Sequence, residues 1–316
     1  MSEQISNETV IDEKPLVTFA LIAYNQEKYI REAVEGAFSQ TYSSLQIILS
    51  DDCSPDRTFE IMEEMAKNYR GRHKIFLNKN AVNLGITGHI NKVGKICSGS
   101  YVVLAAGDDV SLPERTDELL KLCVESNALI AFSEFNILCE NSKTNNLNFV
   151  LKENFEVIKI YTPEKLKDGF FLGPSYIIKK DIFSAFPEIL PGVHHEDILF
   201  PIRAKLLGGN IAYTSKKLIN YNSESGVTFK LQSKIKDDWI SALKVINVRS
   251  FAMTNQILID SNKIGVPVSY LMENRLASFL LELNFIEKRW IKFLTLNFFS
   301  INLWKYKIHL IKKLKL

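Results

Sequence analysis

Short apolar runs alternate with amphipathic segments through the first half of the chain, and this alternation limits the possible folds more than any other feature. The runs at Leu16–Ala23, Leu45–Ser50 and Tyr101–Ala106 have the length and composition of buried strands. Helical patterns separate them, and strands that alternate with helices in this way indicate βαβ units. The sequence therefore predicts an α/β fold in which helices flank a mostly parallel sheet.

The segments between these runs sharpen the prediction. Residues 27–40 repeat apolar side chains at helical spacing, and residues 86–97 form a second helical pattern that two glycines weaken. Residues 54–69 predict a helix with Ser54 as the N-cap and Pro55 at its first position. Residues 74–78 and 128–132 complete the set of predicted strands.

Polar residues follow four of the predicted strands directly. Ligands of open α/β sheets bind beyond the carboxyl ends of the strands, so these residues are candidates for a common site. Each also has a structural interpretation, as a helix cap, a turn residue or a left-handed glycine. The four groups are Tyr24 with Asn25, Asp51 with Asp52, Asn83 to Gly85, and Asp108 with Asp109.

Length and composition limit the number of domains, the class of partner and the cellular compartment. A chain of 316 residues exceeds one average domain, so we expect one large α/β domain with an extension, or two domains. A net charge of +3 gives no indication of nucleic-acid binding. The four cysteines contain no CxxC pair, which is typical of free thiols in a reducing compartment. The first fourteen residues are polar and acidic, without the apolar core of a secretory signal, so we expect a cytoplasmic protein.

Several motifs in fixed order resemble those of inverting family 2 glycosyltransferases of the GT-A type. The blocks are AYNQEKYIREAVEGAFSQTY, IILSDDCSPDRT, NAVNLGITGHIN, LAAGDD and, later, HHEDILFPIRAKLLG. The resemblance extends from about residue 15 to about residue 228 and implies a GT-A fold with a Rossmann-like sheet. We therefore expect an N-terminal tail at 1–14, a catalytic domain at 15–228 and a helical extension at 229–316.

The resemblance also implies a role for each group of polar residues. The acids that follow the fourth strand, Asp108 and Asp109, would hold Mg²⁺ or Mn²⁺, since hard oxygen ligands suit these ions. The ion would bridge the diphosphate of a nucleotide-sugar donor, and a carboxylate elsewhere would accept hydrogen bonds from its base and ribose. The donor-binding residues implied are Ala23, Tyr24, Asn25, Asp51, Asp52, Asn83, Gly85, Asn91, Gly107 and Asp108.

The sequence departs from the family pattern at two places. Ala106 occupies the position of the first acid in the usual Asp-x-Asp-Asp motif, which leaves one carboxylate fewer for the metal. Where many relatives have a histidine near the end of the domain, this chain has Asn222 and Glu224. Glu224 is either a substitute metal ligand or a solvated loop acid, and we favour the second interpretation.

A later acidic pair is the candidate for proton transfer. Inversion at the anomeric carbon needs one base that takes the proton of the acceptor hydroxyl. The resemblance assigns this role to Asp197, with Glu196 as the alternative base or as an acceptor-orienting residue. An acid pair stabilised by a helix N-terminus is the structural alternative. His194 and His195 are adjacent in one loop, so we interpret them as acceptor-site or structural residues rather than metal ligands.

The last third of the chain has a different character. Residues 235–260 predict a helix of a C-terminal extension. Residues 288–316 carry eight Lys or Arg and no acid, interleaved with aromatic residues. Their uncharged run from Phe293 to Trp304 is shorter than the roughly 20 residues that span a bilayer, which favours an amphipathic helix on a membrane surface. A helix packed on the catalytic domain with a solvated basic face is the alternative.

Together these features predict a metal-dependent inverting glycosyltransferase on the cytoplasmic face of the membrane. The expected donor is a nucleotide sugar, of the UDP class, and the expected acceptor is a glycan or polyprenyl-linked glycan of bacterial surface polysaccharide synthesis, such as O-antigen or capsule. A catalytically inactive nucleotide-sugar binding module is the alternative to which Ala106 points. A nucleotidyltransferase would have a glycine-rich basic loop after the first strand, which this sequence lacks.

Overall fold

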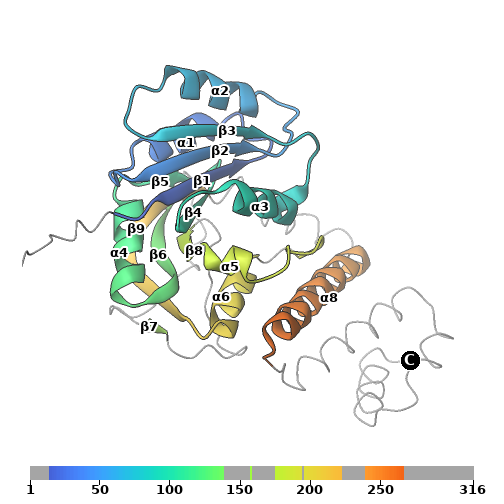
Figure 1. Cartoon of the computed structure of the whole chain (residues 1–316). Coiled ribbons are helices and arrows are strands. Elements are labelled where there is room, and N and C mark those ends of the chain that lie inside the picture. The colour runs from blue at the N-terminus through green and yellow to red at the C-terminus, as the bar shows by residue number, and fades with distance from the viewer. Residues whose placement is uncertain (1–13, 139–156, 159–174, 194–195, 223–238, 267–316) are drawn as a thin grey trace, which may run out of the picture.

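A single twisted sheet runs through the protein. The computed structural model describes residues 14–138, 157–158, 175–193, 196–222 and 239–266. Within them the sheet has nine strands in the order β3-β2-β1-β4-β8-β6-β9-β5, with β7 also paired to β9 (Figure 1). The strands are β1 (Val17–Ala23), β2 (Leu45–Asp51), β3 (Lys74–Lys79), β4 (Tyr101–Ala106), β5 (Val110–Ser111), β6 (Ala128–Leu138), β7 (Val157–Ile158), β8 (Tyr176–Lys179) and β9 (Asn210–Asn222).

The four strands β1 to β4 form the parallel half that the sequence predicts. β1 lies between β2 and β4, with Val17 paired to Leu45 on one side and to Tyr101 on the other. β3 extends this parallel sheet beyond β2. Because these strands point the same way, their carboxyl ends reach one common edge.

The other half of the sheet is mixed. β8 runs antiparallel to both β4 and β6, whereas β6 and β9 are parallel to each other. β5 and β7 are antiparallel to β9. The α/β fold with helices on the sheet is therefore as expected, and its second half contains antiparallel strands that connect distant parts of the chain.

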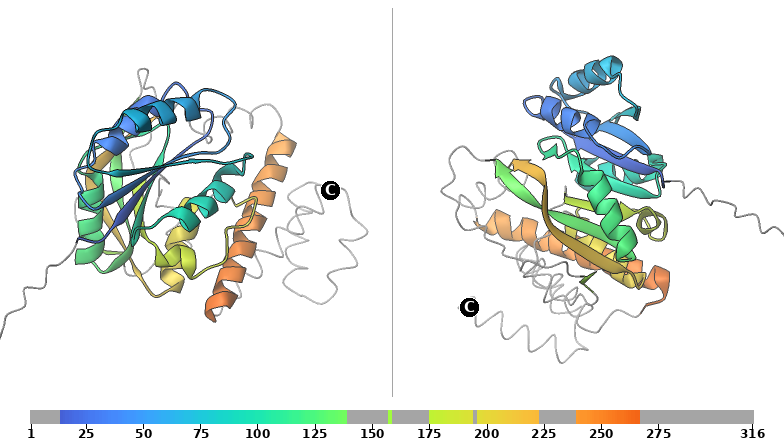
Figure 2. Two further views of the ribbon diagram at one scale, coloured as in Figure 1. Left: turned by 45° about the horizontal axis from the view of Figure 1, so that its top comes forward. Right: turned by 90° about the vertical axis from the view of Figure 1, so that its left-hand side faces the viewer.

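Helices cover both faces of the sheet (Figure 2). Along β1, Phe19 and Leu21 face one hydrophobic core and Ala20 faces the other, as the alternation of side chains in a strand requires. The first core is covered by α1 (Ile30–Phe38), α2 (Thr58–Asn68) and α4 (Arg115–Glu125). The second is covered by α3 (Gly85–Ile96), α5 (Asp181–Ser184), α6 (Glu196–Leu206) and α8 (Trp239–Ile264).

Two predicted details have different outcomes. The prediction that Ser54 caps the second helix is wrong, because α2 begins at Thr58 and Ser54 instead bonds to Asp51 and Asn25 in the preceding loop. A helix does occupy most of the predicted range 235–260, and Ala252 and Ile257 of α8 belong to the second core. The proposed domain boundary at residue 228 stays a prediction.

Candidate active site

The residues that follow β1, β2 and β4 lie side by side at one edge of the sheet. Ala23 at the end of β1 pairs with Asp51 at the end of β2, and Ile22 pairs with Ala106 at the end of β4. The contacts continue past the strands, since Asp52 N donates to Ala23 O at 2.9 Å and Gly107 N donates to Ile22 O at 2.9 Å. The structure thus brings three of the predicted donor-binding groups together.

The loop after β1 is held by the loop that precedes α2. Asn25 N donates to Ser54 Oγ at 2.9 Å, and Gln26 N donates to Thr58 Oγ1 at 2.8 Å. Asn25 has a φ of 56°, a left-handed conformation that asparagine tolerates better than most residues. The neighbouring Tyr24 is 47% exposed, so its ring is accessible to a ligand.

The two acids after β2 are buried and bonded within the protein. Asp51 accepts hydrogen bonds from Ser54 N, at 2.9 Å, and from Ser54 Oγ. Asp52 Oδ1 accepts from Asn80 Nδ2 at 2.8 Å and from Leu84 N at 2.9 Å. These bonds fix the shape of the edge, a role in the fold that the sequence did not reveal.

The turn after β3 reaches the same edge through its bond to Asp52. Asn83 Oδ1 accepts a hydrogen bond from Gly85 N at 2.8 Å, which closes the turn before α3. Gly85 has a φ of 69°, a conformation that favours glycine. The geometry of Asn83 and Gly85 is therefore that of a turn beside the candidate donor site.

Asn91 lies within α3, and its side chain is occupied by the protein. Asn91 Nδ2 donates to Ile189 O at 2.8 Å, and Asn91 Oδ1 accepts from Ile189 N at 2.9 Å. Both polar ends of the amide are thus used by one residue far away in the sequence. Contact of Asn91 with the donor stays a prediction, and below we propose a positioning role for this residue.

The acidic turn after β4 is closely packed. A side chain at Gly107 would place its Cβ 2.4 Å from Gln26 Oε1 and 2.7 Å from Ala23 Cβ, so only glycine fits there. Asp109 is 4% exposed and accepts a hydrogen bond from Asn222 N at 2.9 Å. Asn222 lies at the end of β9, so the segment that the sequence placed near the metal does reach the acidic turn.

Arg115 lies beneath this turn, fully buried, and was not singled out from the sequence. Its guanidinium donates to Ser111 Oγ at 2.7 Å and to Leu104 O at 2.7 Å, which joins β5 to β4 on either side of the acids. No specific sign of this role is visible in the sequence, because an arginine in the first turn of an amphipathic helix usually faces solvent.

The electrostatics of Asp108 and Asp109 fit a cation. Burial raises the pKa of Asp109 to about 7, and the charge of Asp108 adds to this, whereas the bond from Asn222 and the charge of Arg115 oppose it. A bound cation would relieve the repulsion between the two acids. Two adjacent carboxylates also fit Mg²⁺, which is commonly bound by one or two carboxylates together with substrate phosphates. No group of three or more His, Cys, Asp or Glu suited to a metal occurs among the described residues.

The second acidic pair opens α6, as predicted. Glu196 and Asp197 are both half-buried, and Leu199 and Phe200 anchor the helix in the second core. Burial raises the pKa of Glu196 to about 8, with a further contribution from the charge of Asp197. Burial also raises the pKa of Asp197 to about 6. Asp197 Oδ1 is buried and accepts no hydrogen bond from the described part of the chain.

Tyr176 connects the surroundings of the two acidic pairs and was also not predicted. It is 1% exposed at the start of β8, and its ring meets Phe200 of α6 edge-on at 6.1 Å. Burial raises the pKa of Tyr176, and the charges of Glu196 and Asp197 raise it further, whereas Arg115 opposes them. The buried hydroxyl of Tyr176 has no hydrogen-bond partner within the described residues.

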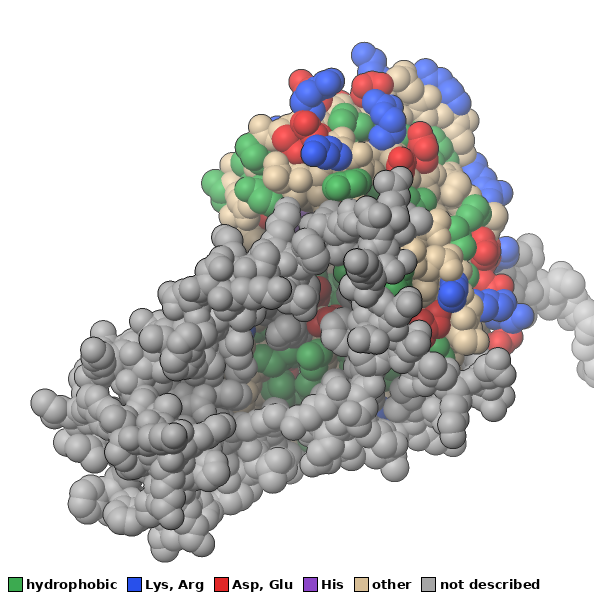
Figure 3. Space-filling view, turned by 180° about the vertical axis from the view of Figure 1, so that it is seen from behind, with side chains coloured by type: hydrophobic (Ala, Val, Ile, Leu, Met, Phe, Trp, Pro, Cys, Tyr) green, Lys and Arg blue, Asp and Glu red, His purple; other side chains and the backbone are tan. Residues whose placement is uncertain are grey.

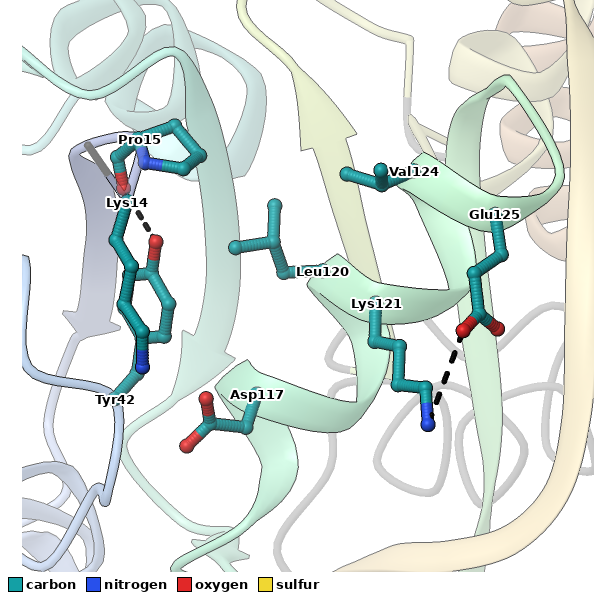
Figure 4. Close-up of a pocket in the computed structure, with 8 residues that line it drawn as sticks. All are labelled: Lys14, Pro15, Tyr42, Asp117, Leu120, Lys121, Val124 and Glu125. Carbon is teal, nitrogen blue, oxygen red and sulfur yellow. Dashed lines mark hydrogen bonds and ion pairs between the residues drawn. The ribbon is translucent and has the colours of Figure 1, made fainter. Parts of the chain in front are cut away.

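Figure 3 shows acidic side chains beside hydrophobic ones among the described residues of one face. A separate cavity of about 310 Å³ lies at the opposite, amino edge of the sheet, next to Pro15 before β1 (Figure 4). Its lining includes Tyr42, whose hydroxyl donates to Pro15 O at 2.6 Å, and it contains none of the predicted site residues.

Some predicted residues fall outside the described part of the structure. These are His194, His195, Glu224 and the basic segment 288–316. Within the described residues, no helix is both long and apolar enough to cross a membrane.

Comparison with known proteins places this geometry among sugar-transferring enzymes. The family model described as Glycosyl transferase family 2 matches residues 18–184. An uncharacterized glycosyltransferase of Methanocaldococcus jannaschii is 28% identical over 60% of this chain and 65% of its own length. TuaG of Bacillus subtilis, named for teichuronic acid biosynthesis, is 26% identical over 40% of this chain and 50% of its own. The chain therefore spans less than two thirds of either relative.

Solved structures share the fold at low sequence identity. Staphylococcus aureus TarS 1-349 in complex with UDP-GlcNAc has a TM-score of 0.58 and 20% identity, over 90% of this chain and 76% of its own. The mannosyltransferase PcManGT of Pyrobaculum calidifontis, in complex with GDP-Man and Mn²⁺, has a TM-score of 0.53 and 12% identity, over 90% of this chain and 88% of its own. At these identities the likeness establishes the fold alone.

Proposed function

We propose a reaction from the premise that this chain belongs to glycosyl transferase family 2. In this proposal the protein transfers a sugar, with inversion, from a nucleotide-sugar donor to a hydroxyl group of a glycan acceptor. The observation that carries the proposal is the presence of two acidic pairs with different surroundings. One pair adjoins the loops at the carboxyl edge of the sheet, and the other opens α6 with a buried carboxylate oxygen that no described residue bonds.

The donor occupies the carboxyl edge of β1, β2 and β4. Tyr24 offers an exposed aromatic face to the base, and Asp52 offers a carboxylate to the base or ribose. The bonds from Asn80 and Leu84 hold that carboxylate in place before the donor arrives, so binding requires little reordering. The remaining donor contacts come from the loop at Ala23 and Asn25, the acid Asp51, the turn at Asn83 and Gly85, and the turn at Gly107 and Asp108.

Asp108 and Asp109 hold a divalent ion, Mg²⁺ or Mn²⁺, in this proposal. The ion supplies positive charge that stabilises the departing nucleoside diphosphate. The NH of Asn222 donates to Asp109, and the guanidinium of Arg115 donates to Ser111 and Leu104 on the adjacent strands. These bonds keep the acidic turn in its shape. Ala106 leaves the ion with one carboxylate ligand fewer than the family pattern, so donor phosphate and water supply more of its ligands.

Asp197 is the proposed base. The proton of the acceptor hydroxyl passes to the Asp197 carboxylate while the acceptor oxygen bonds to the anomeric carbon. The bond between that carbon and the donor phosphate oxygen breaks on the opposite face, and its electrons leave with the nucleoside diphosphate. A pKa of about 6 suits this task, since the carboxylate is largely unprotonated at neutral pH yet basic enough to accept the proton. Burial and the charge of Asp197 raise the pKa of Glu196, which favours its protonated form relative to an ordinary glutamate, and this residue orients the acceptor.

The relatives support a biological setting for this reaction. TuaG is named for teichuronic acid biosynthesis, and TarS was solved with UDP-GlcNAc. We therefore propose a UDP-sugar donor and an acceptor glycan of a bacterial cell-surface polysaccharide, such as O-antigen or capsule, carried on a polyprenyl lipid.

We also propose that the enzyme acts on the cytoplasmic face of the membrane. The support is the composition of residues 288–316, which are rich in Lys, Arg and aromatic residues and have no acid. Deletion of the residues after Glu287 should reduce binding to anionic liposomes and remove its salt sensitivity. Equal liposome binding by the truncated and full-length proteins would show that the tail is not the anchor.

A ligand screen followed by a transfer assay tests the proposed reaction. A panel of nucleotide sugars is added with and without Mn²⁺, and the unfolding temperature is recorded, because a ligand that binds the native state stabilises it. We expect a UDP-sugar to stabilise the protein more strongly with Mn²⁺ and then to be transferred or slowly hydrolysed. Stabilisation without any turnover would favour the inactive binding module that Ala106 suggests. The absence of stabilisation by every nucleotide sugar would contradict the proposal.

A further inference from the structure

The chain that leads into the second acidic pair is an irregular segment held from three sides. Residues 187–193 connect α5 to the region before α6, and in Figure 1 they pass between α3 and α8. Such a segment has no strand partner for its backbone groups, which must find other partners when they are buried. Ile189 is 2% exposed and Val193 is 0% exposed, so the segment anchors two side chains in the protein interior, whereas Pro187, Glu188 and Pro191 are exposed.

α3 holds the segment through one asparagine. Asn91 bonds to both backbone groups of Ile189, donating to O at 2.8 Å and accepting from N at 2.9 Å. This pair of bonds imitates the contact of a neighbouring strand, and it fixes both the position and the direction of the backbone at Ile189. An exposed ion pair between Lys95 and Glu188 lies beside it and contributes little.

α8 holds the next residue. Gln256 Oε1 accepts from Leu190 N at 2.7 Å, and Gln256 Nε2 donates to Asp260 Oδ1 at 2.8 Å. Both Gln256 and Asp260 are 0% exposed. The amide of Gln256 is therefore itself held in one orientation, with its oxygen directed at the segment.

α6 completes the arrangement through a buried ion pair. Arg203 Nε donates to Asp260 Oδ2 at 2.7 Å, and a terminal nitrogen of Arg203 donates to Asp260 Oδ1 at 3.1 Å. The same terminal nitrogen donates to Pro187 O at 2.8 Å, and the guanidinium lies 5.0 Å from the centre of the Phe186 ring. The helix that carries the acidic pair is thus bonded to the start of the segment that leads into it.

We propose that Asn91 and Gln256 are positioning residues for transfer: through the backbone of Ile189 and Leu190 they fix where Glu196 and Asp197 meet the acceptor. The inference rests on the proposed function, because it concerns the placement of the proposed base. The inference also gives α8 a part in the reaction. This helix lies outside the residues that the family model matches. Small displacements of a base have large effects on rate, of the order of 10²-fold for about 1 Å.

The kinetic test separates positioning from donor binding. Asn91→Leu and Gln256→Met remove the bonds to the segment but keep similar volume. We expect kcat to fall by roughly 10- to 100-fold in each variant, with the donor dissociation constant in the presence of Mn²⁺ within about twofold of wild type. Asn91→Asp keeps the acceptor for Ile189 N, so its kcat should lie between those of Asn91→Leu and wild type. Lys92→Leu, at an exposed position of the same helix, is the matched control and should keep wild-type kcat.

Hydrogen exchange supplies a readout that does not depend on activity. Peptides covering residues 187–193 should exchange faster in Asn91→Leu and Gln256→Met than in wild type, while peptides from β1 and β2 should not change. Exchange rates equal to wild type in both variants would overturn the inference, whether or not the wild-type protein shows transfer. The absence of transfer by the wild-type protein would by itself count against the proposed function only. Donor affinity that falls while kcat stays normal in Asn91→Leu would also overturn it and return Asn91 to the donor site.

Discussion

The acids after β2 and the acids that open α6 are two carboxylate pairs built in opposite ways. Asp51 and Asp52 are buried, and hydrogen-bond donors from the protein meet both side chains. Glu196 and Asp197 are half-buried, and one oxygen of Asp197 is buried without a donor from any described residue. Burial raises the pKa of both acids of the second pair, to about 8 and about 6.

The difference separates acids that build the site from acids that react in it. A carboxylate that already accepts hydrogen bonds stabilises the structure around it. A carboxylate with a buried oxygen that lacks a donor is costly to the fold, and burial makes it readier to accept a proton. Substitutions in the two pairs should therefore affect different properties, the first pair mainly stability and the second mainly rate.

The largest effect should come from Asp197→Asn. The substitution keeps the size of the side chain but removes the proton acceptor, so the initial rate of transfer should fall by roughly 10²- to 10⁴-fold. Donor affinity, measured by calorimetry with Mn²⁺, should be close to wild type because the proposed donor contacts come from other elements than α6.

Glu196→Gln is the matched variant for this experiment and should reduce transfer less. Normal turnover by Asp197→Asn together with an inactive Glu196→Gln would move the role of base to Glu196. Normal turnover by both variants would remove the acidic pair of α6 from the reaction.

Asp108→Ala and Asp109→Ala should produce the next largest effect, which is a loss of donor affinity rather than a loss of proton transfer. Each removes a hard oxygen ligand, so donor affinity in the presence of Mn²⁺ should fall by roughly 10- to 100-fold. Without metal, the affinities of variant and wild type should nearly coincide. Calorimetric titration of the donor with and without Mn²⁺ measures both, and unchanged affinity with Mn²⁺ would show that these acids do not hold the ion.

Asp51→Ala tests the structural side of the comparison. It leaves the N–H and the hydroxyl of Ser54 without their acceptor, so the free energy of unfolding should fall by about 1–3 kcal/mol. Asp197→Asn should leave the free energy of unfolding unchanged or higher, because it removes a partly buried charge, one oxygen of which accepts no hydrogen bond from the described residues. Urea unfolding of the two variants, side by side with wild type, gives the answer. Equal losses in both would remove the distinction between the pairs.

The smallest effect is the pH dependence of transfer around neutrality. Asp197 must be unprotonated to act as the base, and its pKa is raised to about 6, so the rate should rise with pH and reach half its plateau near pH 6. Below that pH the rate should fall about tenfold per unit. The rising limb, measured as kcat against pH at saturating donor, should be absent from the residual activity of Asp197→Asn. A limb that persists in this variant would assign the titration to another group.

The parallel half of the sheet was predictable because its signals are local. The predicted ranges of β1, β2 and β4 agree with the structure to within one residue, since buried parallel strands appear as continuous apolar runs. The polar residues at their ends could be placed at one edge by the same argument. The acidic pair at residues 196–197 was placed at the start of a helix by its resemblance to a family motif, and it does open α6.

The parts that escaped prediction depend on contacts between distant residues. Asn91 and Ile189 are 98 positions apart, and Arg203 and Asp260 are 57 positions apart. Nothing in the local pattern around Arg115, Tyr176 or Gln256 distinguishes these residues from ordinary helix or strand positions, because burial and bonding partners arise only when the sheet has closed. The Ser54 prediction failed for a related reason. The Ser54 hydroxyl accepts a hydrogen bond from Asn25 N, about thirty residues earlier in the chain.

The buried pair of Arg203 and Asp260 also sets an order of events while the chain is being made. Translation at about 5–20 residues per second supplies Asp260 only roughly 3 to 11 seconds after Arg203, because 57 residues separate them. During that interval the parallel strands β1 to β4 can already pair, whereas α6 carries a guanidinium that cannot enter the core without its partner. On the ribosome, the edge proposed to bind the donor therefore forms first, and the half that carries the proposed base is completed only when α8 emerges.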